Sequence, residues 1–237
     1  MIVSIAAVPH PPLLVPELVS GGAEGTSVLR QACVAAARRL SHAARAWIAV
    51  AADPSASAVS RADGSGTFRG YGVDVVVSLA EDTRSDTVDP LMPLPALIAG
   101  WLRAQAAAER VDVRLLAPDS PIPRCREFGA SIAGHPGQVG LLVLGDGSTL
   151  HPGPAGRADD RADAYDRRVS RALAAADAEA LLDLDADLGT ELNVGGRAAW
   201  QALAGAALAA GHRWRADLLY SQAPYGTGYH VAVWEPT

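Results

Sequence analysis

The alternation of continuous apolar segments with alanine-rich helical segments constrains the fold more than any other feature. The apolar segments are rich in valine, isoleucine and leucine, and several contain no polar interruption. Such runs are typical of strands that are covered on both faces. We expect strands at Ile2–Val8, Ala46–Ala51, Val73–Ser78, Val113–Ala117, Val139–Leu144, Trp214–Ser221 and Tyr229–Trp234.

The helical segments lie between these strands. Thr26 or Ser27 can cap the first long helix, and Gly211 ends the last one. Strands that alternate with helices predict a three-layer α/β/α fold with a mostly parallel sheet. The last two strands flank "SQAPYGTGYH" like a hairpin, so the sheet is expected to be mixed. Helices are predicted at Ser27–Ala44, Pro95–Glu109, Arg124–Ala133, Asp159–Ala176, Ala178–Leu184 and Gly196–Ala210.

Two long polar connections, Asp53–Tyr71 and Ala80–Pro95, interrupt this pattern. The first is rich in glycine and is long enough for a mobile lid or a disordered segment. Apolar strands resume after each connection, so neither resembles a linker between domains. There is no internal repeat, and we expect a single domain over residues 1–237.

Composition excludes several classes of protein. The net charge is -6, and no basic stripe with interleaved aromatic residues indicates nucleic-acid binding. No apolar run reaches the ~20 residues that span a membrane, and the N-terminal apolar run has no basic leader. The two cysteines are far apart and do not indicate a disulfide framework or a cysteine zinc site. These features predict a cytoplasmic protein.

His10 follows the first predicted strand in "VPHPPLL". Ligands in open α/β sheets bind at the carboxyl ends of strands, where this imidazole would lie. Pro9 and Pro11 stiffen the backbone on both sides of it. His10 is therefore either a ligand or base held in place at little entropic cost, or a packing residue in a structural turn.

Two further strand ends carry polar side chains. Asp53 closes the second strand, where an aspartate also commonly starts a turn. The fifth strand runs into "GDGSTLHPGP", whose Asp146, Ser148, Thr149 and His151 can all face the same rim. This segment is a candidate metal site, acid/base site or anion nest, or else a simple loop. It lacks the lysine of a Walker loop and is not a GxSxG elbow.

Glu191 lies between two predicted helices in "LGTELNVGG" and is either a site residue or part of a turn. The local patterns thus indicate a metal or acid/base cleft. A set of two histidines and one carboxylate, where present, is typical of non-haem Fe(II).

Several segments together carry a resemblance to a known family: "VPHPPLLVPE", "LVLGDGSTLHPGPAGRADDRADAYD", "GGRAAWQALAGA" and "PYGTGYHVAVWEP". In their order along most of the chain, they resemble the catalytic β-subunit family of class III extradiol ring-cleavage dioxygenases, which includes the Memo-like proteins. The resemblance implies an oxidoreductase that cleaves a catechol-type aromatic compound with O₂ at an iron held by two histidines and a glutamate.

The resemblance also implies roles for individual residues. His10 matches the first metal histidine, Asp53 stands where the second is expected, and Glu191 matches the glutamate. The acid/base histidine falls near Thr149, and His151, two residues on, is its substitute. The candidate catalytic residues are His151, Thr149 and Asp146. Because a carboxylate hardens the site, Mg²⁺ or Mn²⁺ would suit it as well as Fe(II).

Three hypotheses follow. The first is a diverged metal-dependent dioxygenase that acts on a small molecule, a catechol-type aromatic. The second is a non-catalytic binding or regulatory protein on the same scaffold with a degenerate metal site. The third is a hydrolase that uses the carboxylates of the cleft. The resemblance further implies a homo-oligomer.

Overall fold

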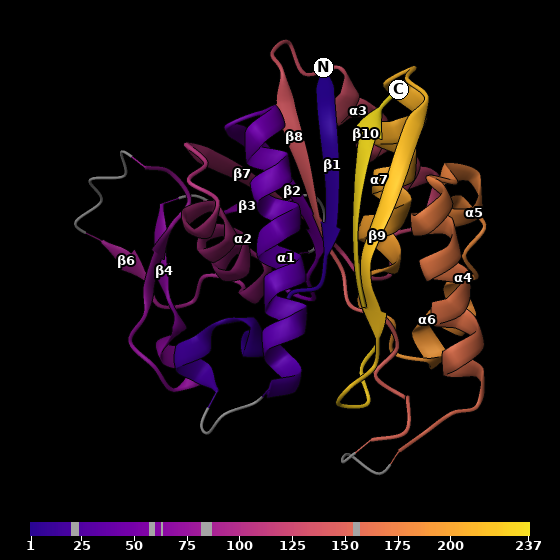
Figure 1. Ribbon diagram of the computed structural model, residues 1–237, viewed down its shortest axis with the longest axis horizontal. Helices are drawn as coiled ribbons and strands as arrows, with labels where there is room; N and C mark the ends of the chain where they lie inside the picture. The colour runs from indigo at the N-terminus through magenta and orange to yellow at the C-terminus, as the bar shows by residue number, and fades with distance from the viewer. Residues whose placement is uncertain (20–23, 57–59, 63, 82–86, 154–156) are drawn as a thin grey trace.

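A computed structural model describes residues 1–19, 24–56, 60–62, 64–81, 87–153 and 157–237 of the chain. In this part, seven strands form a central sheet in the order β3-β7-β2-β8-β1-β10-β9 (Figure 1). Neighbours among β7, β2, β8 and β1 are parallel, whereas β3 at one edge and β10 and β9 at the other pair antiparallel. The predicted mixed, mostly parallel sheet is confirmed. Its strands are β1 (Ile2–Val8), β2 (Ala46–Ala52), β3 (Ser60–Ala62), β7 (Arg110–Leu116), β8 (Val139–Leu144), β9 (Trp214–Gln222) and β10 (Tyr229–Pro236).

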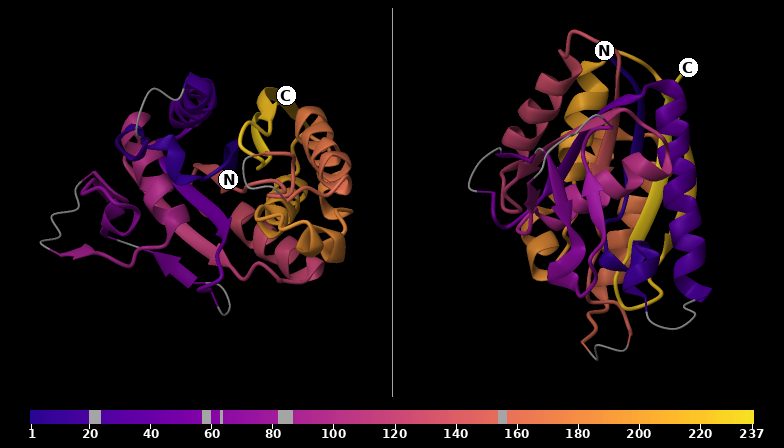
Figure 2. Two further views of the ribbon diagram at one scale, coloured as in Figure 1. Left: turned by 90° about the horizontal axis from the view of Figure 1, so that it is seen from below. Right: turned by 90° about the vertical axis from the view of Figure 1, so that its left-hand side faces the viewer.

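Helices cover both faces of the sheet and complete the three predicted layers (Figure 2). One face packs against α1 (Glu24–Ala43) and α2 (Leu94–Gln105). The other face packs against a larger group: α3 (Ile122–Ala133), α4 (Arg161–Ala175), α5 (Ala178–Leu182), α6 (Ala186–Glu191) and α7 (Arg197–Ala209). No described helix is both long and apolar enough to cross a bilayer.

The continuous apolar runs have a direct structural cause. Successive side chains of a strand point to opposite faces, so Leu142 and Leu144 of β8 pack in the core beneath α1 and α2. Leu141 and Val143 pack in the core on the other side. Because both faces are buried, neither set of positions accepts a polar residue.

The structure corrects the prediction at the polar connections. The expected strand Val73–Ser78 is only β5 (Val76–Ser78), and it belongs to a separate small sheet with β4 (Ser65–Thr67) and β6 (Val88–Asp89). The 3-10 helix η3 (Phe68–Tyr71) follows β4. These strands are two or three residues long and are held by backbone pairing, so they leave no apolar run to detect. Residues 57–59, 63 and 82–86 of the two connections lie outside the described residues.

The segment after His10 turns at once. Two 3-10 helices follow, η1 (Pro12–Leu14) and η2 (Pro16–Leu18), and each begins with a proline. Proline suits a first helical position because its missing N–H would have no partner there. The Leu14 N–H donates to the Pro11 carbonyl at 3.1 Å. His10 is thereby held between the end of β1 and a rigid turn.

Candidate functional site

The carboxyl ends of β1, β2, β7 and β8 open into a cleft of about 470 Å³, which we call the His10 cleft. It contains the polar residues that directly follow these strands. Apolar side chains, among them Leu94 and Val194, form the rest of its wall. The lining residues are His10, Ala52, Asp53, Pro54, Leu94, Pro95, Pro118, Asp119, Asp146, Gly189, Thr190, Asn193, Val194, Gly195 and Arg197.

His10 and Asp146 lie together in this cleft. The backbone N–H of His10 donates to Asp146 Oδ1 at 2.9 Å, and the same oxygen lies 3.8 Å from His10 Nδ1. Nδ1 is buried and has no hydrogen-bond partner among the described residues. A buried polar atom without a partner is costly, so this nitrogen is a candidate for contact with a bound molecule.

Backbone contacts position Asp146 itself. The Gly145 N–H donates to the Val8 carbonyl at 3.0 Å, and the Gly196 N–H donates to the Asp146 carbonyl at 2.7 Å. A Cβ on Gly145 would lie 2.7 Å from the Cα of Gly196. Glycine therefore allows the end of β8 to approach the start of α7, as expected for a turn that carries functional groups.

Asp53 lines the cleft and also makes a turn. Its Oδ1 accepts the N–H of Ser55 at 2.9 Å and the hydroxyl of the same serine. The Asp53 carboxylate therefore stabilises the turn after β2, and the residue also lines the same cleft as His10.

Arg197 is buried at the start of α7 and supports the opposite wall. Its guanidinium donates to the carbonyls of Pro118 and Ser120 and to the side chain of Gln201. These bonds hold the loop after β7, which carries Asp119 into the cleft. Three acceptors already share the charge of Arg197, so it is a structural clamp first.

Glu191 lies elsewhere, contrary to the predicted convergence with His10 and Asp53. It is the last residue of α6, its side chain is 58% exposed, and its carboxylate accepts from Arg161 at 2.8 Å. Glu191 does not line the His10 cleft, whereas its neighbour Thr190 does. No helix was predicted over α6, and the rotation of this short helix about its axis decides which of its side chains face inward.

The candidate catalytic residues divide between two places. Asp146 lines the His10 cleft, but His151 lines a second, smaller pocket of about 160 Å³. We call this second pocket the His230 pocket; its lining residues are His151, Asp163, Asp166, Arg167, Ser170, Ser221, Gln222, Ala223, Gly228 and His230. Thr149 is exposed and lines neither space.

Asp166 is the centre of the His230 pocket. Its Oδ2 lies 2.7 Å from His151 Nε2, and its Oδ1 lies 3.8 Å from His230 Nε2. The backbone N–H of Ser148 donates to both carboxylate oxygens at 3.2 Å. The predicted acid/base histidine thus belongs to a buried network whose other main member, Asp166 on α4, had been given no role in the sequence.

Cross-strand pairing supplies the remaining members, which sequence reasoning missed. Ser221 of β9 lies directly opposite His230 of β10, and its hydroxyl is 2.9 Å from His230 Nδ1. Local sequence patterns assign no role to His230 or Ser221. The polar pair in two strands next to a hairpin was the available signal, but it depends on the strand register.

Burial next to Asp146 also affects neighbouring groups. Burial raises the pKa of Tyr229 to about 12, and the negative charge of Asp146 adds to the rise. Burial likewise raises the pKa of the Cys33 thiol, again with a contribution from Asp146. Both groups are neutral near pH 7, so Asp146 has no ionised partner in either of them.

The arrangement does not fit the three-ligand iron centre that the resemblance implies. Within the part of the chain that the structure describes, no group of three or more histidine, cysteine, aspartate or glutamate side chains could hold a metal ion. His10 and Asp53 share the cleft, but the expected third ligand, Glu191, is bound to Arg161.

Comparisons with known proteins add little. No protein-family model matches the chain, and no curated protein matches it. Among solved structures, it is similar to an uncharacterized protein of Escherichia coli K12, with 14% identity and a TM-score of 0.48 over 98% of this chain and 99% of that chain.

Proposed function

We propose that the His10 cleft binds a small neutral or cationic organic molecule, with His10 as the base that accepts a proton from it. The observation that carries this proposal concerns His10, which lines the cleft: its buried Nδ1 has no hydrogen-bond partner among the described residues. A hydroxyl or amine of the ligand would satisfy this nitrogen.

The charge of the cleft argues for the class of ligand. Asp53, Asp119 and Asp146 are carboxylates on its wall. Among the described lining residues the one guanidinium is that of Arg197, which already donates to three protein acceptors. An anionic ligand would meet like charges at short range. The apolar remainder of the wall, including Leu94, Pro95 and Val194, suits a ring or a short hydrocarbon.

The pair of His10 and Asp146 suits acid/base chemistry. When His10 takes a proton, the imidazolium lies close to the Asp146 carboxylate, 3.8 Å away in this structure. A positioned base of this kind typically contributes ~10²–10⁴-fold to a rate.

Oxidative cleavage of a catechol, which the resemblance implies, has less support. It is favoured only by the common location of His10 and Asp53, and the residues present do not complete the iron site. Metal analysis of freshly purified protein, followed by O₂ uptake with catechol after Fe(II) loading, tests it directly. A bound metal together with O₂ uptake would favour ring cleavage over metal-free proton transfer.

Calorimetric titration with three matched aromatic probes tests the proposed ligand class. We expect catechol and dopamine to bind, and protocatechuate, which carries a carboxylate, to bind at least ~10-fold more weakly. His10→Ala should lower the affinity for catechol by ~10-fold, the loss of one hydrogen bond to a polar ligand. Asp53→Asn removes one negative charge from the cleft and should therefore reduce the difference in affinity between dopamine and protocatechuate.

Two control variants complete this experiment. His42→Ala changes an exposed histidine at the end of α1, and Asp187→Asn changes an exposed aspartate of α6. Neither should alter binding. Equal affinity for the anionic probe, or a His10→Ala protein that binds catechol as tightly as the parent, would refute the proposal.

A further inference from the structure

The His230 pocket contains an ordered series of groups that the function proposed for the His10 cleft does not use. Ser221 Oγ lies 2.9 Å from His230 Nδ1, His230 Nε2 lies 3.8 Å from Asp166 Oδ1, and Asp166 Oδ2 lies 2.7 Å from His151 Nε2. We propose that Ser221 is an activated nucleophile that accepts an acyl group from a small ester, which makes this pocket a second, hydrolytic site.

The direction of hydrogen bonding follows from the charge on Asp166. A carboxylate only accepts, so the stable tautomer of His230 carries its proton on Nε2, which faces Asp166. Nδ1 then has a free lone pair and accepts the hydroxyl proton of Ser221. Hydroxyl, imidazole and carboxylate therefore stand in the order of a nucleophile, its base and the group that orients the base.

The distance of 3.8 Å between His230 Nε2 and Asp166 Oδ1 is longer than a hydrogen bond. His230 is only 4% exposed, and its buried Nε2 has no hydrogen-bond partner among the described residues. Catalytic hydrogen bonds are often long without substrate and shorten when charge develops. A proton taken by His230 would create an imidazolium next to Asp166 and provide the force that closes this gap.

The surrounding structure holds each member in place. The register of β9 and β10 sets Ser221 opposite His230, and the ring of Trp200 lies 6.1 Å from the His230 ring. Asp166 is fixed from behind by the Ser148 N–H and by His151. A Cβ on Gly228 would lie 1.8 Å from Asp166 Oδ2, so only glycine leaves room for the carboxylate.

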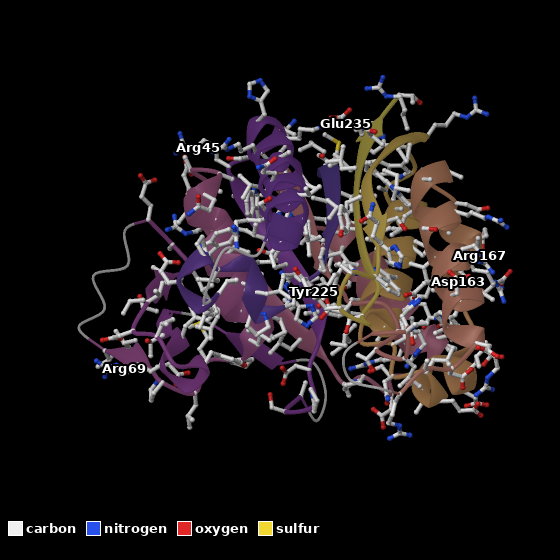
Figure 3. All side chains as sticks on the ribbon, turned by 60° about the horizontal axis from the view of Figure 1, so that its bottom comes forward. Arg45, Arg69, Asp163, Arg167, Tyr225 and Glu235 are labelled. Atoms are coloured by element: carbon white, nitrogen blue, oxygen red, sulfur yellow. The ribbon has the colours of Figure 1, made fainter. Side chains whose placement is uncertain are left out.

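Access and size define the substrate. Ser221 is exposed while its base is buried, so an ester can reach the hydroxyl from solvent. Arg167 and Asp163 form an ion pair on α4 beside the pocket, where Figure 3 shows them next to each other. A volume of about 160 Å³ admits a short acyl group such as acetyl, but not a long chain.

The reaction balances without a cofactor. Ser221 Oγ forms a bond to the carbonyl carbon of the ester, and its proton moves to His230 Nδ1. The carbon–oxygen bond to the leaving alcohol then breaks, and the alcohol takes the proton from His230. Water repeats the two steps on the acyl-serine, which releases the carboxylic acid and restores Ser221.

The test uses p-nitrophenyl acetate with the full chain, followed by peptide mass mapping. The sequence contains no lysine, so the commonest background acceptor of acetyl groups is missing. We expect a burst of p-nitrophenol, with acetyl found on Ser221. Ser221→Ala and His230→Gln should each lower the rate by ~10² or more. Asp166→Asn, a change in a positioning residue, should shift the pH profile of the burst.

Matched controls separate this proposal from loss of folding and from the His10 cleft. Ser131→Ala removes an exposed hydroxyl of α3 that donates to the Phe128 carbonyl and lines neither of the two pockets, and it should keep the burst. Ser221→Cys, a conservative variant, should still be acetylated. Ser221→Ala should bind catechol as the parent does. Acetyl on another residue, or an undiminished burst in folded Ser221→Ala, would overturn the proposal.

Discussion

Asp166 shows how much one buried carboxylate can organise. It accepts the N–H of Ser148, which belongs to the turn after β8, and it lies between His151 and His230. The two residues before Ser148 face different neighbours: Asp146 lines the His10 cleft, and Gly147 lies against Asp166. The segment after β8 therefore reaches both pockets, and the Ser148 N–H donates to the charged carboxylate of Asp166.

Asp166→Asn removes that charge with little change in volume. An amide has one oxygen instead of two, and its NH₂ group would face the N–H donors of the site. We expect the free energy of unfolding to fall by about 1.5–3 kcal/mol, the value of a hydrogen bond to a charged group. Urea unfolding measures this loss. Asp187→Asn, on the exposed side of α6, should change stability by less than ~0.5 kcal/mol; an equal loss in both variants would contradict the argument.

Single residues also show what the sequence could predict about the site. His10, Asp53 and Asp146 follow apolar strands, and the rule that ligands bind at the carboxyl ends of strands was enough to bring them to one cleft. Glu191 could not be placed, because a helix of six residues gives no periodic pattern from which to read its facing side. Ser221 and His230 required the strand register, which a single sequence does not supply.

At the level of elements, α3 and α7 pack closely enough for their backbones to meet. A Cβ on Gly129 of α3 would lie 1.9 Å from the Ala202 carbonyl oxygen, and one on Gly205 of α7 would lie 2.2 Å from the Arg126 carbonyl oxygen. The two helices thus meet backbone to backbone at reciprocal glycines. Since α7 begins at Arg197, this contact also fixes the wall of the His10 cleft.

Gly205→Ala has two opposing effects on stability: it raises the helix propensity of α7, and it adds a methyl group at the contact with α3. In a free helix alanine is favoured over glycine by about 1 kcal/mol. Here the new methyl group meets a backbone atom that cannot rotate away, and such overpacking typically costs about 1–3 kcal/mol or more. We expect a net loss of stability in urea unfolding and a weaker catechol affinity. Gly70→Ala has nothing within 4 Å and should show neither effect; a stabilised Gly205→Ala protein would mean that the helices can separate at little cost.

Elements also differ in how much sequence signal they carry. The strand Val139–Leu144 was predicted to the residue, because both its faces are buried and every position is apolar or glycine. By contrast, β7 begins at Arg110, whereas the predicted strand began at Val113. The prediction missed the first residues because charged side chains alternate with buried valines there, so no continuous apolar run marks the start of the strand. Short strands such as β4 and β6 were missed because backbone pairing, rather than side-chain burial, forms them.

For the molecule as a whole, the two cores on either side of the sheet contain buried tyrosines. Tyr229 lies in the core beneath α1 and α2, and Tyr165 of α4 lies in the core on the opposite face. Burial raises the pKa of both phenols. Both cores are therefore sensitive to alkaline pH, although neither phenol is among the described lining residues of the His10 cleft or the His230 pocket.

The direction of the change in stability with pH follows from the linkage between proton binding and folding. Burial holds the pKa of Tyr229 at about 12 in the folded chain, against an ordinary value of 10.0, so the unfolded chain loses this proton first. The contribution of the neutral Tyr229 phenol to stability is complete below pH 10 and is lost as the pH rises towards 12. Urea unfolding across this range should show stability falling more steeply for the parent than for Tyr229→Phe, which keeps the buried ring but cannot ionise. Below pH 10 the difference between the two proteins should stay constant. Parallel curves above pH 10 would show that Tyr229 ionises as easily in the folded chain as in the unfolded one.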